Sequence, residues 1–386
     1  MKILYDYQAF YMQRFGGVSN CFVKLIENLP DGYDYEIALC ESDNIHLKES
    51  NLKVDFEPCR LSEDIFISKK KFKGRGFLYR NLSTIAPQLT SLGRNRICSV
   101  DSLRKGNYDI FHPTFFDPYF LPYLQEKPFI LTIHDMIPEL FFGPKEMQRR
   151  VKPILCQKAT HIVAVSEKTK ADLMEILHIP ENKIEVIYHG APYSNYNPQI
   201  SPVIAGRYIL FVGKREKYKC FTLMMKALTP VLRRHQDIMV VCTGNPFTNK
   251  ELYSLKKMGL NNRVLCEQVN DKEMQSLYTH ALCFIFPSVY EGFGIPILEA
   301  YANSCPVLLN DTSCFPEIAQ DAALYFHLDE GSSNLEDIME RFLNFSEIDR
   351  AVLLEKERQR LQTFSWSKSA EQLACLYDKV LTLSQH

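Results

Sequence analysis

The sequence predicts an α/β fold made of two doubly wound parallel-sheet domains. Short apolar runs alternate with helical patterns along almost the whole chain, and one unpatterned stretch interrupts this alternation near its middle. Continuous apolar strands that alternate with helices are typical of parallel sheets covered on both faces. A chain of 386 residues is also long for a single core, so two domains are the natural expectation.

Twelve short apolar runs are expected to form strands, six in each domain. In the first domain they are KILYDY (2–7), YEIALC (35–40), DIFHP (109–113), FILTIHD (129–135), HIVAV (161–165) and KIEVIYHG (183–190). In the second domain they are YILFVG (208–213), DIMVVCTG (237–244), RVLCEQ (263–268), LCFIFPS (282–288), PVLLND (306–311) and ALYFH (323–327). Helical patterns lie between them, for example over 19–29, 166–177 and 221–234.

Residues 190–207 are rich in Pro, Ser, Asn and Gly and carry no periodicity, which is typical of a linker. We therefore expect Rossmann-like domains over 1–195 and 196–364. A final helix over 365–386 is expected to pack back on the first domain. Open α/β sheets bind ligands at the carboxyl ends of their strands, so these ends are expected to face a cleft between the domains.

Composition and charge are those of an ordinary globular protein, with 46% hydrophobic and 24% charged residues and a formal net charge of −1. This balance gives no general attraction to nucleic acid. The 12 cysteines are scattered without a C-x-x-C pair, which favours a reducing compartment over a disulfide framework or a zinc site. Asp6 interrupts the apolar start, and no apolar run reaches the roughly 18 residues that span a bilayer. We expect a cytoplasmic protein.

The stretch 288-SVYEGFGIPILEAYANSCPVL-308 places carboxylates on both sides of a predicted helix start. Proline is well tolerated in a first helical turn, so a helix is expected to begin near Ile295. The amides of Gly294 and Ile295, together with the helix dipole, then form an anion site. Glu299, one turn into the helix, can accept hydrogen bonds from hydroxyls beside a bound phosphate, and Glu291 can reach a group on its far side.

The segment PSVYEGFGIPILEAYA resembles the signature of the retaining glycosyltransferases of family 4, which have the two-domain GT-B fold. The resemblance covers nearly the whole chain. It implies an acceptor-binding first domain and a second domain that binds a nucleotide-sugar. It also implies that Glu291 contacts the donor sugar, that Glu299 holds the ribose, and that the amides of Phe293, Gly294 and Ile295 hold the diphosphate.

The resemblance assigns a second group of residues to the donor diphosphate, in 210-LFVGKREKYKCF-221. Lys219 matches the lysine of the family. Lys214 occupies the usual position of the arginine and Arg215 follows it; we favour Arg215, because a guanidinium binds phosphate bidentately. Gly244 matches a glycine that lets the donor approach the sheet.

Two further segments of the first domain, one before a helix and one at a strand end, complete the predicted site. In 14-RFGGVSN-20, the resemblance assigns Gly16 and Gly17 to a loop over the donor phosphate and the acceptor. In 131-LTIHDMIPEL-140, it assigns His134 to the donor sugar. Asp135 either orients His134 or takes part in acceptor binding, and the sequence does not separate these two roles.

The expected reaction is transfer of a hexose, with retention of configuration, from a nucleotide-sugar to a hydroxyl. Arg215, Lys219 and the helix amides would stabilise the leaving phosphate, so neither a metal nor another cofactor is expected, and no D-x-D pair is present. The acceptor is expected to be a glycan or a polyprenyl-diphosphate-linked saccharide of bacterial surface-polysaccharide assembly. GDP-mannose is the first choice of donor and a UDP-hexose the second.

One segment of the first domain is strongly basic. Residues 69–105 hold ten Lys and Arg against one acid, Asp101. This segment suits the anionic inner face of the cytoplasmic membrane or a polyprenyl-diphosphate acceptor, and ordinary solvent exposure of a loop and a helix face explains it equally well. A non-catalytic sugar-nucleotide-binding subunit is the alternative function, although such a subunit has no need to keep Glu291, Glu299, Lys219 and His134 together.

Overall fold

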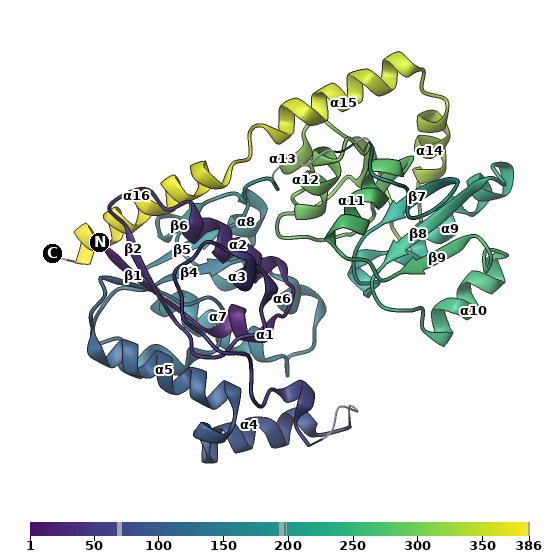
Figure 1. The fold of residues 1–386 in the computed structure, drawn as a ribbon. Helices are drawn as coiled ribbons and strands as arrows, with labels where there is room; N and C mark the ends of the chain where they lie inside the picture. Colours follow the sequence, from purple (N-terminus) through teal and green to yellow (C-terminus); the bar gives the residue numbers. More distant parts are fainter. Residues whose placement is uncertain (68–71, 193–196, 198, 385–386) are drawn as a thin grey trace. The chain divides into compact units, whose positions relative to one another are not determined.

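A computed structural model describes residues 1–67, 72–192, 197 and 199–384 (Figure 1). The chain divides into two compact units. Unit 1 contains Met1–Val165, Thr169–His189 and Trp366–His386, and unit 2 contains Ser166–Lys168 and Gly190–Ser365. The boundary that we expected at 195/196 lies among residues 193–196, outside the described residues, as do Lys69, Lys70 and Lys71 of the basic segment.

Unit 1 is built on six parallel strands. One sheet has the order β2-β1-β3 and a second has the order β4-β5-β6, and a parallel bridge between Phe111 and Phe129 joins the β3 side of the first to the β4 side of the second. In register, Ile3 lies opposite Tyr35 and Ile110. The strands are β1 (Lys2–Asp6), β2 (Asp34–Ala38), β3 (Ile110–His112), β4 (Ile130–Ile133), β5 (His161–Ala164) and β6 (Ile184–Val186).

Helices connect and cover the strands of unit 1. They are α1 (Gln8–Met12), α2 (Gly17–Glu27), α3 (Ile45–Glu49), α4 (Arg75–Ile85), α5 (Ser91–Lys105), α6 (Ile137–Phe141), α7 (Met147–Lys158), α8 (Glu167–Leu177) and α16 (Trp366–Ser384). Short 3₁₀ turns lie at η1 (Glu63–Ile65), η2 (Pro87–Leu89), η3 (Pro118–Tyr123) and η4 (Glu181–Lys183).

The last helix, α16, is part of unit 1 although unit 2 precedes it in the chain. Its Tyr377 is fully buried, and the hydroxyl of Tyr377 lies 2.8 Å from that of Tyr5 on β1 and 2.7 Å from Nδ1 of His112 on β3. Trp366 and other apolar residues of α16 extend the same core, which also includes Phe22 and Val23 of α2. Burial of this apolar face fixes α16 on the sheet.

Unit 2 contains one parallel sheet of six strands in the order β12-β11-β10-β7-β8-β9. The strand order reverses between β7 and β10, which are hydrogen-bonded neighbours, so that Ile209 lies opposite Cys283. This is the doubly wound arrangement, with its switch point between β7 and β10. The strands are β7 (Arg207–Phe211), β8 (Ile238–Thr243), β9 (Val264–Glu267), β10 (Cys283–Phe286), β11 (Val307–Asn310) and β12 (Leu324–Phe326).

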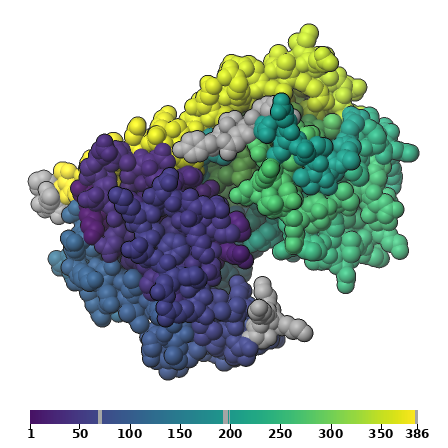
Figure 2. Space-filling model, in the orientation of Figure 1, coloured from purple at the N-terminus to yellow at the C-terminus, as the bar shows by residue number. Residues whose placement is uncertain are grey.

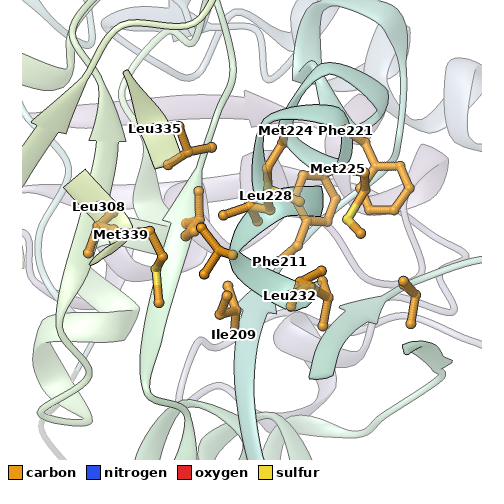
Figure 3. Close-up of a cluster of buried hydrophobic side chains, with 14 of the residues drawn as sticks. Ile209, Phe211, Phe221, Met224, Met225, Leu228, Leu232, Leu308, Leu335 and Met339 are labelled. Carbon is orange, nitrogen blue, oxygen red and sulfur yellow. The ribbon is translucent and has the colours of Figure 1, made fainter. Parts of the chain in front are cut away.

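The core of unit 2 lies between this sheet and two helices, α9 (Phe221–Arg234) and α14 (Leu335–Leu343) (Figure 3). Met224, Leu228 and Leu232 recur along one face of α9 and meet Ile209 and Phe211 of β7. The other elements are α10 (Asn249–Met258), α11 (Asp271–His280), α12 (Ile295–Ala302), α13 (Phe315–Ala319), α15 (Glu347–Leu361) and η5 (Lys217–Lys219).

The structure confirms the predicted fold class. Each of the twelve apolar runs overlaps a strand, and β2 and β7 begin one residue before the predicted run. All the strand pairs are parallel. Every strand ends before its predicted bound. At β7 and β8 the reason is local, because Gly213 and Gly244 turn the chain through a positive φ, at +116° and +112°. Over the described part of the chain, none of the helices is long and apolar enough to cross a membrane.

Candidate functional site

The candidate site in unit 2 lies where the sheet changes strand order. The loops that follow β7 and β10 leave the carboxyl ends of two neighbouring strands that run parallel. Such a switch point is where doubly wound sheets bind their ligands. The loop after β7 carries Arg215 and Lys219, and the loop after β10 carries Glu291 and leads to the start of α12. The sheet topology therefore brings two motifs from distant parts of the sequence to one place.

An ion pair joins these two loops. Nζ of Lys219 donates to Oε1 of Glu291 at 2.5 Å, and the two side chains are only 14% and 11% exposed. The loops are also tied by the amide of Val289, which donates to the carbonyl of Tyr218 at 2.9 Å. Ser313 fixes the backbone of Glu291 from both sides, accepting from its amide at 3.0 Å and donating to its carbonyl at 2.9 Å. Both charges are thus held in fixed positions.

The start of α12 has the backbone geometry that an anion site needs. Gly294 caps the helix with φ +90°, a conformation that residues with a side chain rarely adopt. A Cβ on Gly294 would also lie 3.1 Å from Cδ1 of Ile297. The helix begins at Ile295 with Pro296 in its first turn, as predicted. The first-turn amides of a helix have no carbonyl partner one turn earlier, and they carry the positive end of its dipole.

The ring of Phe293 is packed inside unit 2. Its side chain is 4% exposed, and the ring meets that of Phe364 edge to face, with centroids 5.8 Å apart. This packing anchors the turn that presents Gly294 and Ile295.

Glu299 lies on α12 and contacts α11. The hydroxyl of Tyr278 donates to its Oε2 at 3.1 Å. Burial raises the pKa of the Glu299 carboxyl, and the Tyr278 hydrogen bond opposes that shift. A carboxylate held in this way can accept hydrogen bonds from vicinal hydroxyls, which is the chemistry that binding a ribose requires.

Several protein groups hold the Arg215 side chain in place. Its side chain is 5% exposed, and Nε donates to Oε1 of Glu251 at 2.7 Å. Its Nη2 donates to the carbonyls of Asn245 and Pro246, and the guanidinium lies 4.6 Å from the ring centre of Phe247.

Lys214, by contrast, is 77% exposed and lies 3.9 Å from Glu216. The choice between Lys214 and Arg215 as the diphosphate contact therefore stays open. What the geometry does show is that Arg215 fixes the loop after β8.

Gly244, at the start of that loop, lies next to the loop after β7. A Cβ on Gly244 would be 3.5 Å from the carbonyl oxygen of Gly213. Both glycines have φ values above +110°, so neither position is suited to a residue with a side chain. The carboxyl ends of β7 and β8 are thus lined by bare backbone.

Gly16 and Gly17 stand at the start of α2 in unit 1, with Gly16 as the N-cap. Oε1 of Gln13 accepts from the amide of Ser19 at 3.2 Å, so a side-chain oxygen occupies one of the anion-binding positions at this helix end. A Cβ on Gly16 would lie 2.0 Å from the same oxygen. The glycine therefore makes room for Gln13, a residue that sequence reasoning did not single out.

His134 follows β4 in unit 1, and its ring stacks on that of His189 with centroids 5.7 Å apart and an interplanar angle of 18°. Burial, assisted by the charge of Lys152, lowers the pKa of His134 to about 4, so the imidazole is neutral at physiological pH. Its Nε2 is buried and has no hydrogen-bond partner among the described residues. Asp135 instead accepts from the amide of Ile137 at 2.9 Å, at the start of α6.

Of the predicted residues, unit 2 contains Arg215, Lys219, Gly244, Glu291, Phe293, Gly294, Ile295 and Glu299, whereas Gly16, Gly17 and His134 belong to unit 1. Sequence reasoning missed Tyr278, Ser313 and Glu251, which orient predicted residues. No motif marks them, because each is brought to the site by tertiary packing. Sequence reasoning also missed the place of His189 beside His134.

Two family models match the chain. "Glycosyl transferases group 1" matches residues 201–361, and "Glycosyltransferase Family 4" matches residues 15–194. Between them they account for most of both units, and the chain belongs to the family 4 glycosyltransferases.

Curated relatives include two mannosyltransferases. The chain is 26% identical over 228 residues to the O-antigen chain mannosyltransferase RfbU of Salmonella typhimurium, covering 56% of this chain and 64% of that protein. It is 27% identical over 227 residues to the O-antigen chain mannosyltransferase B of Escherichia coli, covering 53% and 58%. The matches thus span about three-fifths of the length of these relatives.

Solved structures support the fold. A glycosyltransferase from Rickettsia africae superposes with a TM-score of 0.69 at 19% identity, covering 98% of both chains. Alr3699/HepE of Anabaena, solved in complex with UDP and glucose, superposes with a TM-score of 0.70 at 14% identity, covering 98% of this chain and all of that one. The predicted GT-B architecture is confirmed by these neighbours.

Proposed function

We propose that this protein is a retaining hexosyltransferase, which moves a hexose from a nucleotide-sugar to a hydroxyl of a glycan or lipid-linked saccharide. The observation that carries the proposal is the Lys219–Glu291 ion pair at the β7/β10 switch point, where the N-terminus of α12 is also presented. A cation and helix amides suit a diphosphate, and a nearby carboxylate suits sugar hydroxyls.

The leaving group would be stabilised by charges that are already in position. Breaking the bond between the sugar and the diphosphate builds negative charge on phosphate oxygens. Lys219, held by Glu291 at 2.5 Å, and the first-turn amides of α12 are fixed before the reaction begins. Preorganised donors of this kind are worth about 10²–10³ in rate each. Arg215 adds positive charge and holds the loop that starts at Gly244.

The donor sugar would contact two different kinds of group. Glu291 would accept a hydrogen bond from a hydroxyl of the donor sugar, and its carboxylate would stabilise the positive charge that develops on the sugar ring. His134, neutral and with an unpartnered Nε2, would exchange a hydrogen bond with another hydroxyl. We infer attack from the face that the diphosphate leaves, with a phosphate oxygen taking the proton of the acceptor hydroxyl. Such a reaction keeps the anomeric configuration and requires no carboxylate nucleophile.

Mannose from GDP-mannose is our first choice of donor, and the mannosyltransferase names of the curated relatives support it. A UDP-hexose is the alternative, supported by the UDP and glucose held by a protein of the same fold. The test is turnover over a panel of GDP- and UDP-sugars, with the anomeric configuration of the product read by NMR. Turnover of GDP-mannose with retention supports the proposal, whereas no turnover of any sugar nucleotide, or inversion, contradicts it.

We also propose that transfer needs no divalent metal, since Lys219 and the α12 amides supply the charge that a metal would otherwise provide. Initial rates measured with and without EDTA test this point. Rates in EDTA that are equal to or higher than those without it agree with the proposal. A loss of rate that is restored by Mg²⁺ or Mn²⁺ contradicts it.

We propose that the basic segment contacts an anionic membrane through α4. Phe77, Leu78 and Ile85 of this helix are 64%, 46% and 83% exposed, and segment 75–89 lies at the surface (Figure 2). Exposed Lys73 and Arg80 lie on either side of Phe77 and Leu78 in the sequence. Apolar side chains beside basic ones are typical of helices that bind anionic lipid.

Sedimentation with vesicles tests this surface. Phosphatidylglycerol-containing vesicles should retain the protein and neutral vesicles should not, and Phe77→Ser/Ile85→Ser should reduce binding. A matched control, Ile348→Ser on α15 in unit 2, removes an apolar group that is 76% exposed and should bind normally. Equal binding to both kinds of vesicle, or equal losses in both variants, would refute the proposal.

A further inference from the structure

Three metal-ligating side chains converge in unit 1. Cys21 lies on α2, His134 follows β4 and His189 follows β6. One donor atom from each residue lies within 4.8 Å of the other two, and Sγ of Cys21 is 3.2 Å from Nδ1 of His189. The three residues are far apart in the sequence, so no spacing motif announces them.

The two imidazoles of the cluster are held side by side, with their ring centroids 5.7 Å apart and an interplanar angle of 18°. His134 also has a buried Nε2 without a hydrogen-bond partner among the described residues, which is a costly arrangement unless another group binds there.

A small cavity lies beside the cluster. Its volume is about 10 Å³, which is the space that one water-sized particle needs. The polar side chains of its lining come from Cys21, Thr132, Tyr188 and His189, and the rest of the lining is apolar, as with Leu25 and Leu373. There is room for a single ion next to the thiol and one imidazole.

We propose that Cys21, His134 and His189 form a three-ligand site for a borderline-soft divalent ion of the Zn²⁺ class. One sulfur and two imidazole nitrogens suit this ion, and a fourth position is left for water. Zn–S and Zn–N bonds of about 2.3 and 2.0 Å put tetrahedral donors about 3.5 Å apart. The Cys21–His189 separation of 3.2 Å already fits, and the third donor needs to move by only about 1 Å. On binding, the thiol loses its proton to solvent and the sulfur binds the metal as thiolate.

Occupancy of this site would inhibit transfer, because the metal takes His134 away from the donor sugar. This consequence rests on the proposed function, whereas metal binding itself does not. The site would therefore make a metal-independent enzyme sensitive to free zinc.

Cobalt titration tests the site without any use of catalysis. Co²⁺ bound to a thiolate gives a charge-transfer absorption band, which should saturate at one equivalent in the wild-type protein. The band should be lost in Cys21→Ser and strongly reduced in His189→Gln, which removes a second ligand and keeps the cysteine. Cys98→Ser is the matched control: Cys98 is a partly exposed thiol that interacts with Cys40 outside the cluster.

The outcomes are decisive in both directions. A band that persists in Cys21→Ser, or one that disappears in Cys98→Ser, overturns the proposal, because the metal then binds elsewhere. Circular dichroism confirms that each variant is folded, and Cys21→Ala replaces Cys21→Ser if the serine variant is not.

Zinc inhibition provides the second test. Zn²⁺ buffered in the micromolar range should reduce wild-type turnover at least tenfold, EDTA should restore it, and Cys21→Ser should keep its basal rate and resist zinc. Equal zinc inhibition of wild type and Cys21→Ser overturns the regulatory part. If wild type has no turnover with any donor, the proposed function fails, and the cobalt titration still decides whether the metal site exists.

Discussion

Replacing Lys219 by alanine removes the proposed leaving-group cation and leaves Glu291 without its partner. The two side chains are 14% and 11% exposed. Breaking a fully buried ion pair from one side costs about 3–5 kcal/mol. With this partial exposure we expect a loss of about 2–3 kcal/mol in the free energy of unfolding of unit 2. Loss of a preorganised donor should lower kcat by about 10²–10³.

Two further variants separate these effects. Glu291→Gln in the Lys219→Ala background removes the unpaired charge and should restore most of the stability, measured by urea unfolding, but not the rate. Lys219→Arg keeps the charge and should recover part of the rate, measured as donor turnover per folded protein. Turnover of Lys219→Ala within about threefold of wild type, a change of under 1 kcal/mol in activation free energy, would refute the leaving-group role.

Three other predictions follow from the same structure. Arg215→Lys should lower kcat/KM by roughly tenfold or more, because a lysine cannot keep the contacts with Glu251 and two backbone carbonyls. The kcat/KM of Lys214→Ala should stay near that of wild type. The reverse ranking of the two variants would assign the diphosphate contact to Lys214. Gly294→Ala should lower the free energy of unfolding by about 1–3 kcal/mol, measured with urea, because Gly294 has φ +90° and an added Cβ would lie 3.1 Å from Ile297. The control Gly331→Ala, whose Cβ would lie 3.6 Å from Asp329, should change that free energy by under about 0.5 kcal/mol. Equal effects of the two substitutions would contradict the strain argument. Burial lowers the pKa of His112 and His189 to about 3, so below pH 6.5 the unfolded chain binds protons that the folded chain does not, and each histidine should lower the free energy of unfolding by on the order of 1 kcal/mol by pH 5.5. Trp366 fluorescence, which reports on unit 1, should show the urea midpoint falling between pH 7 and 5.5. A constant midpoint would contradict this prediction.

The architecture could be predicted because local patterns determine it. Each apolar run is long enough to be a strand and too short to be a helix of the core, and the linker interrupts the alternation clearly. Helix starts were also readable, since Pro296 and Gly294 have positional meaning at a helix N-terminus. Strand ends were less readable, because a glycine within an apolar run gives no sign of whether its φ is positive.

The candidate site could be predicted only in part. Lys219 and Glu291 lie within motifs that single them out, but their contact depends on the order of strands β7 and β10. The partners of Arg215 were not predictable, because Glu251 reaches it from α10 through tertiary packing. The cluster of Cys21, His134 and His189 escaped for the same reason: its members come from three separate elements, and no C-x-x-C or similar spacing links them.

The central claim is that the β7/β10 switch point of unit 2 binds the diphosphate of a nucleotide-sugar. Isothermal titration of GDP and GMP, and of UDP and UMP, into wild type and Lys219→Ala tests this most directly. One of the diphosphates should bind wild type at least about tenfold more tightly than its monophosphate, a difference of about 1.4 kcal/mol, and Lys219→Ala should abolish most of that difference. Equal affinity of wild type for each diphosphate and its monophosphate, or a preference that survives in Lys219→Ala, would contradict the account.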